Sequence, residues 1–464
     1  MFSLLKSKKT ACCIEKILTL ADYFDLPWLG HRDNESTMEQ LMQYIWQHRL
    51  WRSEDMLTND GRPVRVLDPG LLNTDAGPDF FNAKVEIDGQ TWVGNVEIHV
   101  RASDWKRHGH DRDNAYDSVV LHVVDKDDAP VLRSNGERIP QLVLQVSPLF
   151  DSSYRQLVNS KLELPCENVI ASVPRLTITE WIERLAFERL HSKVQRVRDL
   201  LEMYHGSWED VCYVTVARNL GFGINNDAFE RLARRTPLRL LHKHSDSLMQ
   251  IEALLFGQAG MLDPMATGTD TYYQHLCSEY AFLANKFSLR PMEPESWKLF
   301  RIRPQNFPYR RIAMLAHYIE GSFRLMAQIL DASGEKELRK LFQVELTGYW
   351  SNHYSFGKPQ ERPSLALSNR SIDIVLINTV APLYYAYGEI TGNYALTDKA
   401  ISLLESLPAE KNSIVDSFAR AGIDCDSALT TQALIELRRS YCDARKCIYC
   451  KIGHRLLSEA AHRE

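Results

Sequence analysis

The chain is 464 residues long, 44% of them hydrophobic and 25% charged, and it carries a formal net charge of -5. This composition is typical of a globular protein. The net charge excludes a uniformly basic nucleic-acid binder but does not exclude local basic patches. No apolar run reaches the ~18 residues of a membrane-spanning helix. Nine cysteines are sparse and odd in number, which argues against a disulfide framework, so we expect a cytoplasmic protein outside the membrane.

The length predicts two or three domains, because single hydrophobic cores stop growing near ~250–300 residues. Residues 1–37 place basic residues before an apolar run, as a signal peptide does, but Glu15 and Lys16 interrupt that run and no small-residue cleavage site follows. We interpret this segment as an N-terminal extension and Met38 as an alternative start of the native chain. A regular helical pattern begins at Met38.

A β-hairpin is predicted between residues 83 and 100. Apolar residues alternate with polar ones on both sides of the turn signal Asp88-Gly89. The apolar positions are Ala83, Val85 and Ile87 in the first strand and Val96, Ile98 and Val100 in the second. Glu97 and His99 therefore share the opposite face of the second strand, and Asp79 stands at the entrance to the first.

Asp79, Glu97 and His99 are the predicted catalytic residues. The two carboxylates suit a hard divalent cation, magnesium or manganese, and the imidazole suits the orientation or deprotonation of a water molecule. The alternative is a strand face that carries polar groups only because it is exposed to solvent. The pairs Gly77-Pro78 and Gly94-Asn95, beside the two carboxylates, are unusual in a plain exposed strand and favour the functional interpretation.

The remaining strands predict a mixed sheet in residues 38–170. Pro63–Leu67 is a short strand, and residues 118–124 form a nearly continuous apolar strand that we expect to be buried on both faces. Pro140–Val146 is expected at an edge, and a short helix near Ser103–His108. The fold class is therefore α+β, with an N-terminal mixed β-sheet domain and flanking helices, followed by a mostly α-helical region over 171–464.

Thr177 is the predicted N-cap of the first long helix of that region. The segment 349–370 is predicted to be a loop. Further helices are expected around 208–220, 226–235, 247–257, 271–286, 309–330, 335–346, 371–390, 395–405 and 428–440.

Two more groups of residues have the chemistry of metal ligands. His108 and His110 form an His-x-His pair in a polar loop and, with His99, offer nitrogen ligands for zinc or manganese; His122, in the apolar strand, is more typical of a hydrogen-bonded core histidine. At the C-terminus, Cys442, Cys447 and Cys450 lie close together, with His454 four residues on. We predict that they bind zinc or an iron–sulfur cluster, with His454 as the fourth ligand and Cys425 as the alternative. The competing interpretation is reduced, buried thiols.

Arginines interleaved with aromatic residues predict contacts with DNA or RNA. The residues are Arg301, Arg303, Arg310 and Arg311, next to Phe300, Phe307 and Tyr309. Solvated helix faces are the alternative explanation. Oligomeric state has no signal in the sequence.

The run GPDFFNAKVEIDGQTWVGNVEIHVRASDWKRHGHD and the tail QALIELRRSYCDARKCIYCKIG resemble an uncharacterised bacterial family, domain of unknown function 2851, from Met38 to the end. Separately, Pro78-Asp79 followed across a hairpin by Glu97-Ile98-His99 is similar to the core of the PD-(D/E)XK nucleases. That resemblance implies magnesium on Asp79 and Glu97, with His99 where the superfamily has a water-activating lysine.

These observations predict metal-dependent phosphodiester hydrolysis on nucleic acid. Two alternatives remain open. One is a non-catalytic scaffold that binds nucleic acid or protein and whose metal site is structural. The other is a zinc-dependent hydrolase of small molecules that uses His99, His108 and His110.

Overall fold

The computed structural model describes residues 34–51, 56–266, 270–300, 302, 306–361 and 365–462. Contacts within the chain divide it into two compact units, Met1–Val169 with Arg445–Glu464, and Ile170–Ala444. In this division the helical unit ends at residue 444, and the C-terminal segment belongs to the unit that holds the sheet. Nearly all of the N-terminal extension lies outside the described residues, as do Arg301 and Arg303.

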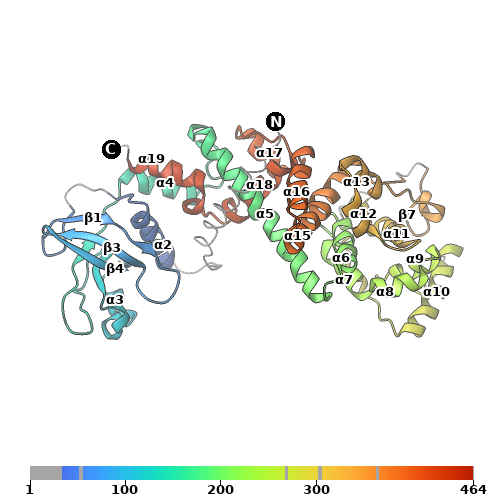
Figure 1. The fold of residues 1–464 in the computed structure, drawn as a ribbon, viewed down its shortest axis with the longest axis horizontal. Helices are drawn as coiled ribbons and strands as arrows, with labels where there is room; N and C mark the ends of the chain where they lie inside the picture. The colour runs from blue at the N-terminus through green and yellow to red at the C-terminus, as the bar shows by residue number, and fades with distance from the viewer. Residues whose placement is uncertain are drawn as a thin grey trace. The chain divides into compact units, whose positions relative to one another are not determined.

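A six-stranded mixed sheet organises the first unit. Its strand order is β1-β3-β4-β5-β6, with β2 paired to β3. Strands β1, β3 and β4 are antiparallel neighbours, whereas β5 runs parallel to both β4 and β6 (Figure 1). The strands are β1 Val64–Asp68, β2 Leu71–Leu72, β3 Phe80–Ile87, β4 Gln90–Arg101, β5 Val119–Lys126 and β6 Gln141–Val143.

The hairpin β3–β4 turns where the sequence predicts it. Asp88 and Gly89 both have positive φ, 51° and 77°, which is the backbone of the type I′ turn that Asp-Gly favours. Strand β5 lies between two parallel neighbours, and its first six residues are buried, so the prediction of burial on both faces is confirmed. The fold class predicted from the sequence is confirmed as well.

Two irregularities next to Asp79 and Glu97 set the register of the hairpin. The β3–β4 pairing shifts between Phe80 and Ala83, and Asn82 there has φ 56°. Bulges of this kind redirect neighbouring side chains and are frequent beside functional sites. On β4, a Cβ added to Gly94 would lie 2.7 Å from the Ser118 carbonyl oxygen, so only glycine lets β5 begin this close to β4.

Four helices belong to the sheet unit: α2 Asn34–Gln47, α3 Asp104–Arg107, α4 Pro148–Val158 and α19 Lys451–Ala461. Helix α2 packs on the sheet through Leu41, Ile45 and Trp46, which join the sheet core. Helices α4 and α19 lie side by side although they are far apart in the sequence (Figure 1). The helix α4 was missed, whereas the short α3 is confirmed.

The second unit is helical, with a small hairpin, β7 His353–Ser355 and β8 Lys358–Pro359, inside the segment predicted as a loop. Its α-helices are α5 Arg175–Met203, α6 Trp208–Leu220, α7 Asn226–Arg235, α8 Leu238–Leu241, α9 Leu248–Gln258, α10 Thr271–Phe287, α11 Pro308–Ile319, α12 Leu325–Asp331, α13 Glu335–Phe342, α14 Asn369–Val375, α15 Ala381–Thr391, α16 Tyr394–Ser406, α17 Ser413–Arg420 and α18 Ala428–Glu436. Two π-helical segments, Leu376–Val380 and Leu437–Cys442, continue α14 and α18.

The predicted cap of α5 is wrong, because the helix begins at Arg175, after Pro174, and includes Thr177. Pro174 is therefore the N-cap residue, and it makes no side-chain hydrogen bond to the first turn of α5. Among the described residues, no helix is long and apolar enough to cross a bilayer.

Candidate metal centre

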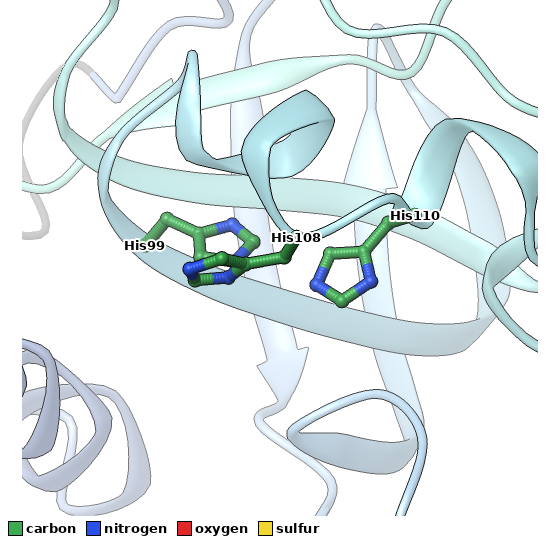
Figure 2. A group of neighbouring side chains, drawn as sticks. All are labelled: His99, His108 and His110. Carbon is green, nitrogen blue, oxygen red and sulfur yellow. The ribbon is translucent and has the colours of Figure 1, made fainter.

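Three histidines from β4 and the segment after α3 converge at the buried end of β4. Figure 2 shows the imidazole of His99 extending from the strand toward the segment that carries His108 and His110. Each of the three offers one ring nitrogen, and these nitrogens lie within 4.8 Å of one another. His99 Nε2 and His108 Nδ1 are 3.1 Å apart. His110 is held in place by stacking on Tyr116, with ring centroids 3.7 Å apart.

The carboxylate of Glu97 joins this group. Its Oε1 lies 3.3 Å from His110 Nε2 and 3.6 Å from His99 Nε2. Ligand atoms at zinc-like distances in a tetrahedron lie about 3.3 Å from one another. The spacing of these side chains therefore fits a single divalent transition-metal ion, and the same distances suit the hydrogen bonds that connect the groups without one.

Asp79 lies directly beside Glu97 but in a different role. Its backbone N–H donates to Glu97 Oε2 at 3.0 Å, and its own Oδ2 accepts from the Ile98 N–H at 2.9 Å. Gln43 Nε2, on α2, donates to its Oδ1 at 2.9 Å. These bonds orient both carboxylates and use both oxygens of Asp79, so Asp79 fits the role of a positioning residue better than that of a ligand.

Glu39, on α2, is a member of the centre that sequence reasoning missed. Burial, and then the charges of Asp79 and Asp104, raise the pKa of its carboxyl to about 7. Its own charge contributes to the raised pKa of Glu97, so Glu39 acts electrostatically on the centre. Glu39 and Gln43 are four residues apart on one helix, a spacing that puts both on one side of α2, but no local signal places that side against the hairpin.

The protonation states of these groups favour metal binding. Burial, followed by the other histidines, lowers the pKa of His99 to about 2, and burial lowers the pKa of His110 as well. Burial raises the pKa of Glu97 to about 8 and that of Asp79 well above its usual value. The imidazoles are thus neutral, as ligands must be, and a bound cation would displace the proton that the raised pKa leaves on Glu97 at neutral pH. A set richer in imidazole than in carboxylate favours zinc or manganese over magnesium.

His122 on β5 supports His99 from behind. Its Nε2 is 2.8 Å from His99 Nδ1 and the residue is fully buried, while its Nδ1 has no hydrogen-bond partner. If His99 Nε2 coordinates a metal, Nδ1 must carry the proton and donate to His122 Nε2, which fixes the tautomer of His99. His122 therefore fits the role of a residue that orients His99, in addition to filling the core.

The structure corrects two expectations about the hairpin. The face that holds Glu97 and His99 is not a solvated strand face, because these residues are only 5% and 1% exposed. His99 is also poorly suited to deprotonate water, since an imidazole with a pKa near 2 is a very weak base at neutral pH. Its two ring nitrogens, 2.8 Å from His122 Nε2 and 3.1 Å from His108 Nδ1, fit the role of a ligand or of an orienting group better than that of a base.

The zinc or iron–sulfur site of the cysteine-rich tail stays a prediction. Among the described residues, the group with three ligand atoms within 4.8 Å is the histidine one, not Cys442, Cys447, Cys450 and His454. His454 Nδ1 instead lies 2.6 Å from the Tyr44 hydroxyl, and its Nε2 lies 3.3 Å from Ser458 Oγ. Cys425 belongs to the helical unit, with its Sγ 3.3 Å from the Ile423 carbonyl.

The arginines predicted to contact nucleic acid are buried where the structure describes them. Arg310 is 0% and Arg311 3% exposed. Arg310 donates to the carbonyls of Trp350 and His353, at 2.9 and 2.7 Å, and Arg311 lies over the ring of Phe222. The prediction is wrong for these two residues, because their guanidinium groups bind the protein itself.

Comparison with known proteins identifies the family. The family described as "Protein of unknown function (DUF2851)" matches residues 39–413. The chain belongs to this family. The match to DUF2851 begins near Met38, as expected, but ends before the cysteine-rich tail. No curated protein and no solved structure matches the chain, so the similarity to PD-(D/E)XK nucleases is not confirmed by these comparisons.

Proposed function

We propose that this DUF2851 protein is a metal-dependent hydrolase and that its substrate is a phosphodiester bond in nucleic acid. The observation that carries the proposal is the position of Glu97. Its carboxylate links the Asp79 backbone amide to the ring nitrogens of His99 and His110 at the buried end of β4. Three histidine nitrogens within 4.8 Å of one another, with the Glu97 carboxylate beside two of these histidines and supporting hydrogen bonds behind them, are typical of a metal centre.

In this proposal His99, His108, His110 and Glu97 hold zinc or manganese. A bound metal ion would supply Lewis-acid polarisation of a phosphoryl oxygen and a water of lowered pKa. Asp79 and His122 orient Glu97 and His99. Glu39 is the proposed general base, since a carboxyl with a pKa about 7 accepts a proton efficiently at neutral pH.

The choice of a phosphodiester rests on the arrangement of Asp79 and Glu97. They face each other across an antiparallel hairpin, and the next strand, β5, returns parallel to β4 after the short helix α3. The resemblance to the PD-(D/E)XK core implies a metal at this place; in the present proposal Glu97 remains a ligand, Asp79 orients it, and the histidines supply the other ligands. Arg107, which pairs with Asp104 at 3.0 Å beside the centre, adds a cation at its edge.

A second candidate is a zinc-dependent hydrolase of small molecules. The observation that favours it is the group of His99, His108 and His110, because three histidines and one open position are a common ligand set of catalytic zinc. The two candidates share the metal centre and differ in the substrate.

The test is a cleavage assay on labelled single- and double-stranded DNA and RNA with manganese, magnesium or zinc. We expect cleavage by the wild type and none by Glu97→Gln, which removes an anionic ligand with little change in volume. Glu86→Gln is the matched control, because Glu86 lies on the neighbouring strand β3 and pairs with Arg65 at 2.6 Å, away from the centre. Equal turnover by wild type and Glu97→Gln would contradict the assignment. Absence of nucleic-acid cleavage, together with hydrolysis of small esters or amides that Glu97→Gln abolishes, would favour the second candidate.

A further inference from the structure

A cavity of about 280 Å³ lies within the helical unit. It is lined by α9, the first turn of α10 and the 3-10 turn Gly348–Ser351. Glu252 of α9 and Trp350 are the buried members of its lining, whereas Thr347 and Gly348 are exposed and mark the side that opens to solvent. The volume is close to the lower limit of small-molecule sites, which begin at ~300 Å³. The cavity therefore suits a small ligand or the end of a longer one.

Stacked aromatic rings form one wall of this cavity. Tyr272 and Tyr349 lie face to face, with ring centroids 4.1 Å apart and planes at 12°, and His353 also stacks on Tyr349, at 3.8 Å. Hydrogen bonds hold these rings in place. Trp350 Nε1 donates to Tyr272 Oη at 2.9 Å, and Tyr349 Oη donates to Asp270 Oδ2 at 2.6 Å. Fixed tyrosine and tryptophan rings present the negative faces that attract an organic cation.

The Glu252 carboxylate is the charged group of the cavity. It is 4% exposed, and its Oε2 accepts a hydrogen bond from Tyr272 Oη at 2.7 Å. Burial, and then the charge of Glu320, raise the pKa of Glu252 to about 7, against the hydrogen bond from Tyr272, which lowers it. A bound cation would favour the ionised carboxylate and displace its proton.

Glu230, the other buried glutamate of the helical unit, shows how this unit treats a buried carboxylate. Three arginines lie within 3.3 Å of it, namely Arg196, Arg218 and Arg234. Within the part of the chain that the structure describes, Glu252 has no such cation beside it. A buried carboxylate is costly to keep ionised unless a positive charge accompanies it. A ligand with a positive charge would supply at Glu252 what the arginines supply at Glu230.

We propose that this cavity binds an organic cation with an alkylated ammonium group, which pairs with Glu252 and packs on the aromatic rings around it. An anion would be repelled by the carboxylate. A metal ion needs several oxygen, nitrogen or sulfur ligands, whereas the wall beside Glu252 consists of rings. The site belongs to the helical unit and goes beyond the proposed hydrolase.

The experiment is isothermal titration calorimetry of the full chain with choline, whose quaternary ammonium group keeps its charge at every pH. The ligand control is 3,3-dimethyl-1-butanol, which has the same shape with a carbon atom in place of the nitrogen. We expect choline to bind saturably. The neutral alcohol should bind more weakly by roughly tenfold, because it lacks the charge that the rings and the carboxylate attract.

Variants of two carboxyls locate the site. Glu252→Gln keeps the size of the side chain but removes its charge, so the affinity for choline should fall roughly tenfold. Glu345→Gln is the matched control, because Glu345 is exposed and close in sequence to Thr347 at the rim. It should bind choline as the wild type does. Glu97→Gln should do so as well, which separates this cavity from the metal centre.

A peptide that carries trimethyllysine is titrated in parallel, because a protein side chain can present the same ammonium group. Tighter binding of the peptide than of choline would identify a protein as the source of the group, and the reverse order would identify a free small molecule. Both orders support the proposal.

Three results would overturn the proposal. The first is that neither choline nor the peptide binds. The second is equal affinity for choline and for the neutral alcohol, and the third is equal affinity of Glu252→Gln and Glu345→Gln for choline. The comparison of choline with the alcohol needs the wild type alone, so it decides even if Glu252→Gln does not fold.

Discussion

Two sets of buried polar side chains, one in each unit, were both predicted to be functional, and the structure separates them. At the end of β4, the side chains of Glu97, His99 and His110 bond mainly to one another. In the helical unit, the guanidinium of Arg310 donates hydrogen bonds to two backbone carbonyls and lies over the ring of Tyr354. Polar groups that face one another leave coordination sites for a ligand, whereas groups bonded to the backbone hold the chain in place.

Glu39→Gln tests the centre at the end of β4, and its effect on kcat is the largest that we expect. If Glu39 is the general base, kcat for nucleic-acid cleavage should fall by roughly 10²–10⁴-fold while the metal content stays that of the wild type. Glu97→Gln, by contrast, should lose the metal. Steady-state kinetics with metal analysis on the same samples measures both. A Glu39→Gln protein with unchanged kcat contradicts the role of Glu39 and leaves the metal centre standing.

Arg310→Met tests the other side of the comparison. Removal of the guanidinium leaves the carbonyls of Trp350 and His353 without their buried donor, so the free energy of unfolding should fall by roughly 3 kcal/mol. Urea denaturation measures this, with Arg231→Met as the control because Arg231 is exposed on α7. A fully stable Arg310→Met protein that has lost affinity for DNA or RNA would restore the interpretation of this segment as a nucleic-acid surface.

The pH dependence of stability should carry the signature of the buried carboxyls. The pKa values of Glu39 and Glu97 in the folded protein, about 7 and 8, lie above their ordinary value, so the stability they contribute is present at low pH and lost as pH rises through these values. For each carboxyl, the metal-free protein should lose about 1.4 kcal/mol per pH unit between the ordinary pKa of 4.5 and the raised value, and nothing more above it. Added manganese or zinc should reverse the loss, because metal binding displaces the same protons.

Melting temperatures from about pH 4.5 to pH 8.5, with and without metal, measure this dependence. Glu97→Gln should flatten the metal-free curve, because glutamine has no proton to lose. A metal-free curve that is the same for wild type and Glu97→Gln would show that Glu97 ionises normally.

His122→Phe is the smallest expected effect. It removes the acceptor that fixes the tautomer of His99 and should weaken metal binding roughly tenfold, as loss of an outer-shell partner does. The free energy of unfolding of the metal-free protein should also fall by roughly 1–3 kcal/mol, because the substitution leaves the buried Nδ1 of His99 without its partner. Calorimetric titration and urea denaturation give the two numbers. A metal affinity equal to that of the wild type would show that His122 is only a core histidine and does not support metal binding.

The sheet was predictable because its signals are local. Alternation around Asp88-Gly89 specifies the hairpin, and the continuous apolar run of β5 indicates a strand with neighbours on both sides. The pairing of Asp79 with Glu97 did not follow from this pattern, because the register of Ile87 with Gln90 continues to Asp79 opposite Ile98. The bulge between Phe80 and Ala83 shifts the register by one residue and brings Asp79 beside Glu97.

What the sequence did not reveal depends on contacts between distant segments. Glu39 belongs to the centre only because α2 packs against the hairpin, and His454 is engaged by Tyr44, which is 410 residues away. The arginine segment misled for the same reason. An arginine among aromatic residues has the same local sequence pattern whether it faces solvent or is buried. Arg310 is buried, and it donates to carbonyls that a separate segment of the chain supplies.

Anomalous diffraction from crystals of the protein soaked in manganese or zinc tests the metal centre most directly. The predicted result is one strong peak at the end of β4, about 2.0–2.2 Å from His99 Nε2, His110 Nε2 and Glu97 Oε1, and its disappearance in Glu97→Gln. A well-ordered His99, His110 and Glu97 with no peak between them, at metal concentrations that fill other sites, would contradict the account.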